Sequence, residues 1–253
     1  MLEHKKIQNL SDYFVELNSR REKGVYFYRI NGYSEEVGEF IKKYYDTARR
    51  TGVVIEGKIP NPDEGNLAYY NEIMGMDFQM SMDFIHVSLR KWLPRMNEFQ
   101  RQNVAASIYD SLDSLRKAGK TENMLRNAYI KFMCWLYYKF ERIVNQLGEN
   151  HIPKILYEGQ ISNYELMLIS ILSNAGCDVV LLQYAGDQGY LKTDPGSVLS
   201  DSLQMEGLRP FPQGYCVKKV RDEIQNELNN ETVWNQTFAY KLYKCMDKGK
   251  RPG

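Results

Sequence analysis

Long apolar runs are absent from this sequence of 253 residues. No stretch approaches the roughly 20 consecutive apolar residues that a membrane-spanning helix needs, and residues 1–6 lack the apolar core of a secretory signal. These absences argue against insertion into a membrane and against secretion. The sequence therefore predicts a cytoplasmic protein without a membrane partner.

An excess of charge of either sign is also absent. The 33 Lys and Arg residues nearly balance the 32 Asp and Glu residues, which leaves a formal net charge of +1. Binding to nucleic acid depends on positive charge that neutralises phosphates, so the composition excludes a bulk electrostatic attraction and leaves only a local patch. We expect no nucleic-acid partner.

Recognisable catalytic and cofactor signatures are missing as well. Cys134, Cys177, Cys216 and Cys245 form no CxxC pair and, with three scattered histidines, make no zinc site. We expect four free thiols in a reducing compartment. Neither GxGxxG nor GxxxxGK followed by Ser or Thr occurs. The sequence therefore assigns no catalytic residue, no metal and no cofactor, and it leaves open whether the protein is an enzyme.

What the sequence does contain is an alternation of strand and helix patterns, which predicts an α/β fold. Residues 25–30 and 53–55 are rich in β-branched and aromatic side chains, as strands are. Between them, a helix capped by Ser34 extends to about residue 50. Strand, helix and strand in this order predict parallel strands joined by a crossover. Residues 1–75 are therefore interpreted as an N-terminal α/β region.

Residues 76–148 predict a wholly helical region, with segments at 81–93, 98–118 and 121–147. The stretch 128–140, which includes Trp135, is apolar on nearly every side. Such a pattern is typical of a buried central helix. We therefore expect the Trp135 side chain to be buried.

Residues 149–253 return to an α/β pattern. A strand at 152–157, a helix that begins near Ser162 and a strand at 177–182 have the length of one Rossmann-like βαβ unit. Two polar surface helices are expected at 218–229 and 233–246, and the abrupt end indicates either a frayed tail or a truncated region. The predicted fold class is thus α/β, with Rossmann-like parallel βαβ units and a helical middle region.

The candidate site residues follow the predicted strands. Ligands of open α/β sheets bind beyond the carboxyl ends of the strands, and six polar or charged residues fall there: Arg29, Asn31, Glu56, Glu158, Ser162 and Asn163. If the strands form one sheet, these residues converge on one crevice suited to an anionic small molecule, between the Arg29 guanidinium and the helix amides after Ser162. If the strands form two sheets, each residue is satisfied locally.

Each candidate also has a simpler alternative. Arg29 ends an aromatic strand and needs solvent, a carboxylate or an anionic ligand. Glu56 and Glu158 each stand between a strand and a glycine. Carboxylates in such positions bind a metal, take part in acid–base chemistry or accept hydrogen bonds from loop amides. Ser162 or Asn163 could serve only as a helix cap.

Three segments resemble the YceG-like family of bacterial proteins: residues 24–33 (GVYFYRINGY), 52–62 (GVVIEGKIPNP) and 153–165 (PKILYEGQISNYE). The resemblance extends from about residue 20 to about residue 215. Members of this family are encoded beside tellurite-resistance genes and are described as a component of a "biosynthetic module". The resemblance therefore implies a cytoplasmic role in stress or tellurite resistance. It supplies no demonstrated reaction and hence no catalytic residue.

Two functions of different classes follow. The first is a cytoplasmic enzyme, or enzyme subunit, that acts on or binds a phosphate- or sugar-bearing small molecule at the sheet edge. The alternative is a non-catalytic scaffold that binds proteins of the same gene cluster through its helical middle and tyrosine-rich surface. The resemblance favours the first function, whereas the missing signatures favour the second.

Overall fold

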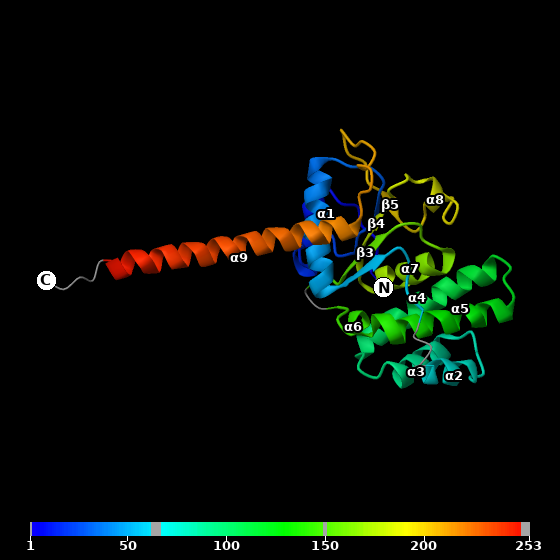
Figure 1. The fold of residues 1–253 in the computed structure, drawn as a ribbon. Helices are drawn as coiled ribbons and strands as arrows, with labels where there is room; N and C mark the ends of the chain where they lie inside the picture. The colour runs from blue at the N-terminus through cyan, green and yellow to red at the C-terminus, as the bar shows by residue number, and fades with distance from the viewer. Residues whose placement is uncertain (1, 62–66, 149–150, 249–253) are drawn as a thin grey trace. The chain divides into compact units, whose positions relative to one another are not determined.

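The computed structural model describes residues 2–61, 67–148 and 151–248, and it describes side chains as far as residue 238. The chain divides into two compact units, Met1–Gln213 and Gly214–Gly253. The first unit contains the sheet and most of the helices, and the second contains one long helix (Figure 1). The two units are described one at a time.

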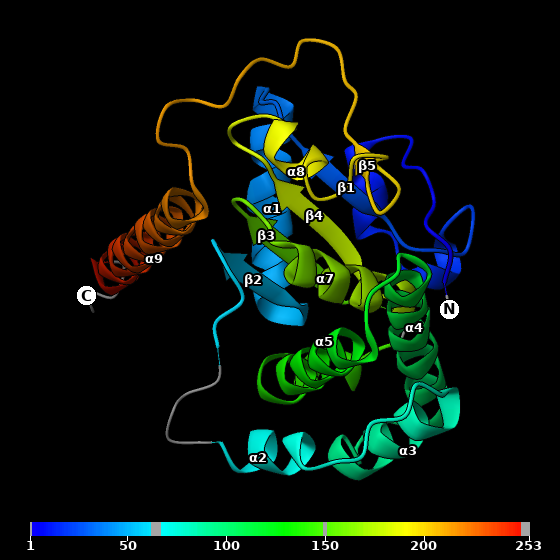
Figure 2. The same cartoon turned by 90° about the vertical axis from the view of Figure 1, so that its right-hand side faces the viewer.

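One sheet of five parallel strands organises the first unit. The strands are β1 (Phe27–Ile30), β2 (Val53–Glu56), β3 (Lys154–Glu158), β4 (Asp178–Leu182) and β5 (Asp201–Ser202). Their order across the sheet is β2-β3-β4-β1-β5, and every pairing is parallel (Figure 2). The predicted α/β class and the predicted parallel strands are confirmed. The N-terminal and C-terminal strands share this one sheet, because β3 and β4 lie between β2 and β1.

Helices cover both faces of the sheet. Figure 2 shows α1 (Glu35–Thr51) behind the sheet and α7 (Asn163–Ala175) in front of it. The Ser34 hydroxyl accepts a hydrogen bond from the Val37 amide at 3.2 Å and caps α1 as predicted.

Gly52 joins α1 to β2, and a Cβ at this position would lie 1.7 Å from the Lys154 carbonyl oxygen. This close approach of β2 to β3 therefore requires glycine.

A layer of helices packs on the α7 side of the sheet. It contains α2 (Ala68–Met74), α3 (Met82–Trp92), α4 (Glu98–Lys117) and α5 (Glu122–Trp135), followed by a π-helical turn (Leu136–Phe140) and α6 (Glu141–Val144). These helices and α7 share one hydrophobic core with the strands. Trp135 is 4% exposed, which confirms its predicted burial.

Three shorter helices complete the first unit. Two 3₁₀ segments, η1 (Leu10–Phe14) and η2 (Leu17–Ser19), precede β1, and α8 (Gln188–Leu191) lies between β4 and β5.

Cys134 and Cys177 are buried free thiols, and Cys216 is also free. The side chain of Cys245 lies outside the described residues.

The second unit contains α9 (Val217–Lys248), a single helix of 32 residues. The sequence predicts two helices here, at 218–229 and 233–246, and this division is wrong: the segment forms one helix because no glycine or proline interrupts it. Within the described residues, none of the helices has the length and apolar character needed to cross a bilayer.

Candidate functional site

The carboxyl ends of four strands lie level with one another. In the parallel register, Glu56 pairs with Glu158, Glu158 pairs with Leu182, and Leu182 pairs with Ile30. Because neighbouring strands lie about 4.8 Å apart, the end of β3 is about 10 Å from the end of β1. The six candidate residues therefore lie along one edge of one sheet, although up to 134 positions separate them in sequence.

The two Glu-Gly sequences form matching turns beside each other. Gly57 and Gly159 have φ values of +83° and +96°, a region that favours glycine. The Gly57 amide donates to the Glu158 carbonyl at 3.0 Å, and the Gly159 amide donates to the Leu182 carbonyl at 3.2 Å. The Glu158 carboxylate accepts a hydrogen bond of 2.6 Å from the Tyr184 hydroxyl. These turns direct the chain away from the sheet at its carboxyl edge.

The pleat of the strands separates the charged candidates. Side chains alternate between the two faces of a sheet, and Tyr157 belongs to the core beneath the helical layer. Glu158 and its register partner Glu56 therefore project toward the α1 face. Phe27 belongs to the same core as Tyr157, so Arg29 lies on the opposite face from the two carboxylates. The alternation assigns these side chains to a face only once the register between the strands is known, which the sequence alone does not supply.

Arg29 is held by partners within the protein. Its Nε and one terminal nitrogen each donate to the Asp187 carboxylate at 2.8 Å. The other terminal nitrogen donates to the carbonyl and the hydroxyl of Ser200 at 2.6 and 2.8 Å. The guanidinium also lies 4.1 Å from the centre of the Tyr190 ring, and Arg29 is 1% exposed. The sequence allowed solvent, a carboxylate or an anionic ligand as the partner of Arg29. In the structure the partner is the Asp187 carboxylate, and this pairing holds the chain segment after β4 in place.

The start of α7 is also satisfied locally. The Ser162 amide and hydroxyl donate to the Glu165 carboxylate at 3.0 and 2.5 Å, and Glu165 accepts a further hydrogen bond of 2.6 Å from the Ile59 amide. Asn163, the first residue of the helix, is exposed. The amides at the start of a helix attract anions, but here the negative charge of Glu165 repels them. The capping alternative for Ser162 is therefore the one that the contacts favour.

An open crevice of about 630 Å³ lies at the carboxyl ends of β4, β1 and β5. We call it the edge crevice, and its lining residues are Asn31, Gly32, Tyr184, Ala185, Gly186, Leu203, Gln204, Met205, Leu208, Arg209 and Pro210. The chain leaves β1 past β4 toward the β2 edge, and it leaves β4 past β1 toward β5. Ligands of open α/β sheets bind beyond the carboxyl ends of the strands, which is where this crevice lies.

The charge of the edge crevice comes from Arg209. The Tyr33 amide donates to the Arg209 carbonyl at 2.7 Å, and the Arg209 amide donates to the Tyr33 carbonyl at 3.0 Å, which fixes this backbone beside β1. The guanidinium is exposed, and no carboxylate of the described residues pairs with it. No Asp or Glu of the described chain lines the crevice. The lining is therefore positive and suited to an anion.

Asn31 is the predicted site residue that lines the edge crevice, where its amide also donates to the Ser202 hydroxyl at 3.2 Å. Sequence reasoning missed Arg209, because residues 203–213 carry no periodic pattern and no motif. The one available signal was Gly32. A Cβ there would lie 3.1 Å from the Leu208 Cβ, so the glycine allows the Leu208–Arg209 segment to approach the end of β1.

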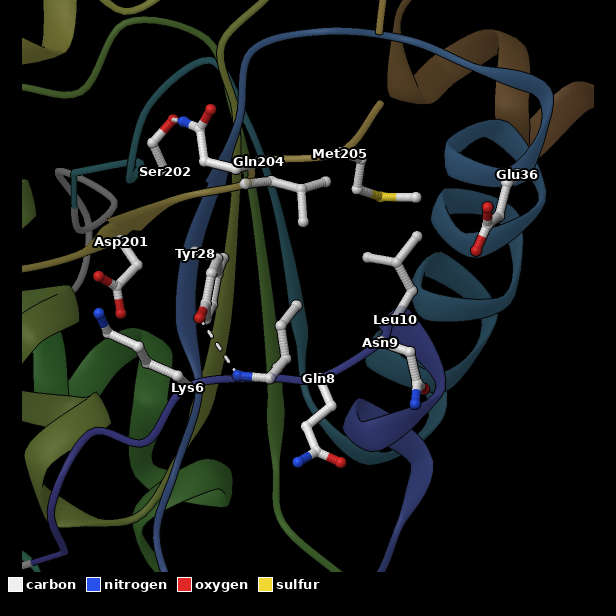
Figure 3. Close-up of a pocket in the computed structure, with 12 residues that line it drawn as sticks. Lys6, Gln8, Asn9, Leu10, Tyr28, Glu36, Asp201, Ser202, Gln204 and Met205 are labelled. Atoms are coloured by element: carbon white, nitrogen blue, oxygen red, sulfur yellow. Dashed lines mark hydrogen bonds between the residues drawn. The ribbon is translucent and has the colours of Figure 1, made fainter. Parts of the chain in front are cut away.

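A second hollow of about 510 Å³ shares residues 203–205 with the edge crevice but lies against the N-terminal segment 6–10 (Figure 3). The Ile7 amide donates to the Tyr28 hydroxyl at 3.2 Å, and Figure 3 marks this bond as the dashed line at Tyr28. Its charged lining residues are Lys6, Glu36 and Asp201. Burial and the charge of Asp201 raise the pKa of Tyr28. With two carboxylates and one lysine, this hollow suits an anion less well than the edge crevice does.

A family model described as YceG domain matches residues 5–242. The chain belongs to the YceG domain family. The match includes all five strands, the edge crevice and most of α9. No curated protein matches this YceG domain. No solved structure matches it.

The described part of this YceG domain contains no group of three or more His, Cys, Asp or Glu side chains that could hold a metal ion. Glu56 and Glu158 are register partners and could contribute two carboxylates to one ion. A metal at this edge would need its remaining ligands from water or from a bound molecule.

Proposed function

We propose that this YceG domain binds a small anionic molecule, bearing a phosphate or a sugar phosphate, in the edge crevice. The observation that carries the proposal is the lining of this crevice. It combines the Arg209 guanidinium, which pairs with no described carboxylate, with polar side chains and no described Asp or Glu, at the carboxyl ends of β4, β1 and β5. The proposal concerns binding and assigns no reaction.

The residues in and beside the edge crevice take distinct roles in this proposal. Arg209 pairs with the phosphate, since a guanidinium can donate two parallel hydrogen bonds to such a group. Asn31 and Gln204 face the polar remainder of the ligand. Arg29 positions the segment that contains Tyr184, through its bonds to Asp187.

The remaining candidates are assigned to the rim of the site. Glu158 orients the Tyr184 hydroxyl, which lies beside the crevice. Glu56 stands next to Glu158 and could join it in binding a cation that accompanies the ligand. Ser162 and Asn163 begin α7 after the neighbouring strand. They would contact only a ligand that extends beyond the crevice.

The cellular setting that we propose rests on the resemblance of the three sequence segments. We infer a bacterial cytoplasmic component of a tellurite-resistance or stress-associated biosynthetic module, built on a Rossmann-like sheet. Deleting the gene in its host and measuring growth on tellurite tests this setting. Increased sensitivity that the intact gene reverses supports it, and unchanged growth contradicts it.

Thermal unfolding in the presence of candidate ligands tests the binding proposal. The panel contains ATP, UDP-glucose, glucose 6-phosphate and pyrophosphate, each with and without Mg²⁺. A ligand present at 100 times its Kd stabilises the folded state by about 2.7 kcal/mol, so binding is readily detected. We expect at least one phosphate-bearing compound to raise the unfolding temperature.

Variants of Arg209 test where the compound binds. Removal of a charge-assisted hydrogen bond costs about 1.5–3 kcal/mol, so Arg209→Ala should weaken affinity by about 10- to 100-fold, and Arg209→Lys should weaken it less. Arg90→Ala, which removes an exposed guanidinium from α3, is the matched control and should bind as the wild type does. Equal affinity of wild type and Arg209→Ala would rule out the edge crevice.

A non-catalytic scaffold for proteins of the same gene cluster is the second candidate. Exposed apolar side chains on α9, including Trp234, favour this function because such surfaces are typical of protein interfaces. The scaffold function would be supported over ligand binding if none of the compounds in the panel changes the unfolding temperature and a protein encoded nearby co-purifies with this chain.

A further inference from the structure

Helix α9 presents large apolar side chains to solvent. Leu228, Val233, Trp234 and Phe238 are 46%, 61%, 66% and 52% exposed. The Trp234 and Phe238 rings stack in parallel, with 5.4 Å between their centres and 5° between their planes. Two aromatic rings joined in this way form one flat apolar surface on the helix, of the kind that usually contacts another protein.

The length and composition of α9 favour a partner for this surface. At 1.5 Å per residue, its 32 residues extend for about 48 Å. Ile224, Leu228, Trp234 and Phe238 recur near the helical repeat, and Leu242 and Met246 continue the four-residue spacing in the sequence. In proteins, the stability of such a helix comes mainly from packing of its apolar face rather than from helix propensity.

The charges along α9 indicate what that partner is. Residues 222–231 contain four carboxylates and no Lys or Arg, for a net charge of −4. Residues 239–248 contain three lysines and one aspartate, for a net charge of +2. The two segments lie at similar distances on either side of Trp234 and Phe238. The helix is therefore complementary in charge to a reversed copy of itself.

We propose that α9 pairs with α9 of a second copy of this chain, antiparallel, with the two helices meeting at Trp234 and Phe238. In this arrangement the acidic segment of each copy lies beside the lysine-rich segment of the other. The aromatic pair of each copy packs against that of its partner at the centre. A parallel pair in register would instead place the two acidic segments together, which is unfavourable.

Sedimentation equilibrium of the full chain over a dilution series tests the pairing. We expect the wild type to dimerise, and the double variant Trp234→Ala with Phe238→Ala to have a dissociation constant at least about tenfold higher. Val198→Ala removes another exposed apolar side chain, at 80% exposure in the first unit, and should leave the dimer unchanged. Both aromatic side chains are exposed, so the double variant should fold, which circular dichroism verifies.

Charge reversal tests the orientation. Glu227→Lys with Glu231→Lys should weaken an antiparallel dimer, and adding Lys241→Glu with Lys244→Glu should restore it. High salt should also weaken the wild-type dimer. A chain that stays monomeric at every concentration, or a dimer that the aromatic double variant leaves intact, would overturn the proposal. A dimer strengthened by Glu227→Lys with Glu231→Lys would overturn the antiparallel orientation.

Discussion

The two ends of the sheet both carry charged side chains, but they use them differently. At the amino end, Asp178 opens β4 and is 0% exposed. It accepts hydrogen bonds from Arg20, from Lys154 and from the Tyr26 amide. At the carboxyl end, Arg29 is paired in the same way with Asp187, but the Arg209 guanidinium has no carboxylate partner among the described residues. Charges whose partners lie inside the protein stabilise the fold, whereas an exposed charge without a partner is available to a ligand.

The amino-end cluster also shows how burial affects charge. Arg20 donates to both oxygens of Asp178 at 2.9 and 2.5 Å, and Lys154 donates at 2.6 Å. Two cations thus share one buried carboxylate. Burial lowers the pKa of Lys154, although the neighbouring Asp178 raises it. No comparable burial occurs at Arg209, whose side chain reaches solvent.

The largest effect on stability is expected from Asp178→Asn. This change leaves the buried Arg20 and Lys154 without their counter-charge, and breaking a buried ion pair by removing one partner costs about 3–5 kcal/mol. Urea unfolding measures the loss. Asp201→Asn, at a half-buried carboxylate that forms no described ion pair, is the control and should cost far less. A loss below about 1 kcal/mol for Asp178→Asn would show that the cluster does not stabilise the fold.

A smaller effect is expected from alkaline pH at Tyr44, whose hydroxyl donates to the Asp178 carbonyl at 3.0 Å. Burial raises the pKa of Tyr44 well above 10. The folded state therefore keeps the proton that the unfolded state releases, and stability falls as the pH rises above 10. Between pH 9 and pH 11, Tyr44 should account for a loss on the order of 1 kcal/mol.

Tyr44→Phe should reduce the difference between the unfolding free energies at pH 9 and pH 11 by that amount. The variant will lose some stability at both pH values, because its hydrogen bond is gone, but the comparison across pH removes this constant cost. An unchanged pH dependence would mean that the Tyr44 phenol ionises as easily in the folded state as in the unfolded state.

Glu158→Gln at the carboxyl end should cost only about 0.5–1.5 kcal/mol, the usual contribution of one hydrogen bond. The hydrogen bond in question comes from the Tyr184 hydroxyl, at 2.6 Å, and both side chains are half-buried. Urea unfolding beside Asp178→Asn gives the direct comparison. Equal losses for the two variants would remove the distinction between the two ends of the sheet.

The smallest effect on stability is expected from Arg209→Ala. Substitutions of exposed side chains usually change the free energy of unfolding by less than about 0.5 kcal/mol. The same variant should nevertheless lose affinity for a phosphate-bearing ligand. A variant that unfolds at much lower urea concentration would assign Arg209 to the fold rather than to a site.

Local features of the fold could be predicted from the sequence. Ser34 and Ser162 begin α1 and α7 as their spacing indicates, and the Glu-Gly sequences mark the ends of β2 and β3. The order of the strands could not be predicted, because β1 pairs with β4, about 150 residues away, through packing that leaves no local signal. The two-residue strand β5 is too short for a periodic pattern.

The candidate site was predictable only in part, for the same reason. The sheet edge and Asn31 follow from the ends of the strands. The partner of Arg29 does not, since Asp187 lies 158 positions away in the sequence. Arg209 joins the site through a backbone bridge to Tyr33, and Gly32 alone, with no indication of which segment approaches it, is too weak a signal to predict that contact.

Backbone amide shifts in an NMR titration with the most stabilising phosphate-bearing compound test the central claim most directly. Gly32 and Gly186 line the edge crevice, whereas Gly24 lies at the amino end, where its carbonyl accepts a hydrogen bond from Arg20. We predict saturable shifts at Gly32 and Gly186, none at Gly24, and loss of the shifts in Arg209→Ala. Shifts centred on Gly24, or shifts that persist in Arg209→Ala, would contradict a ligand site at the carboxyl edge.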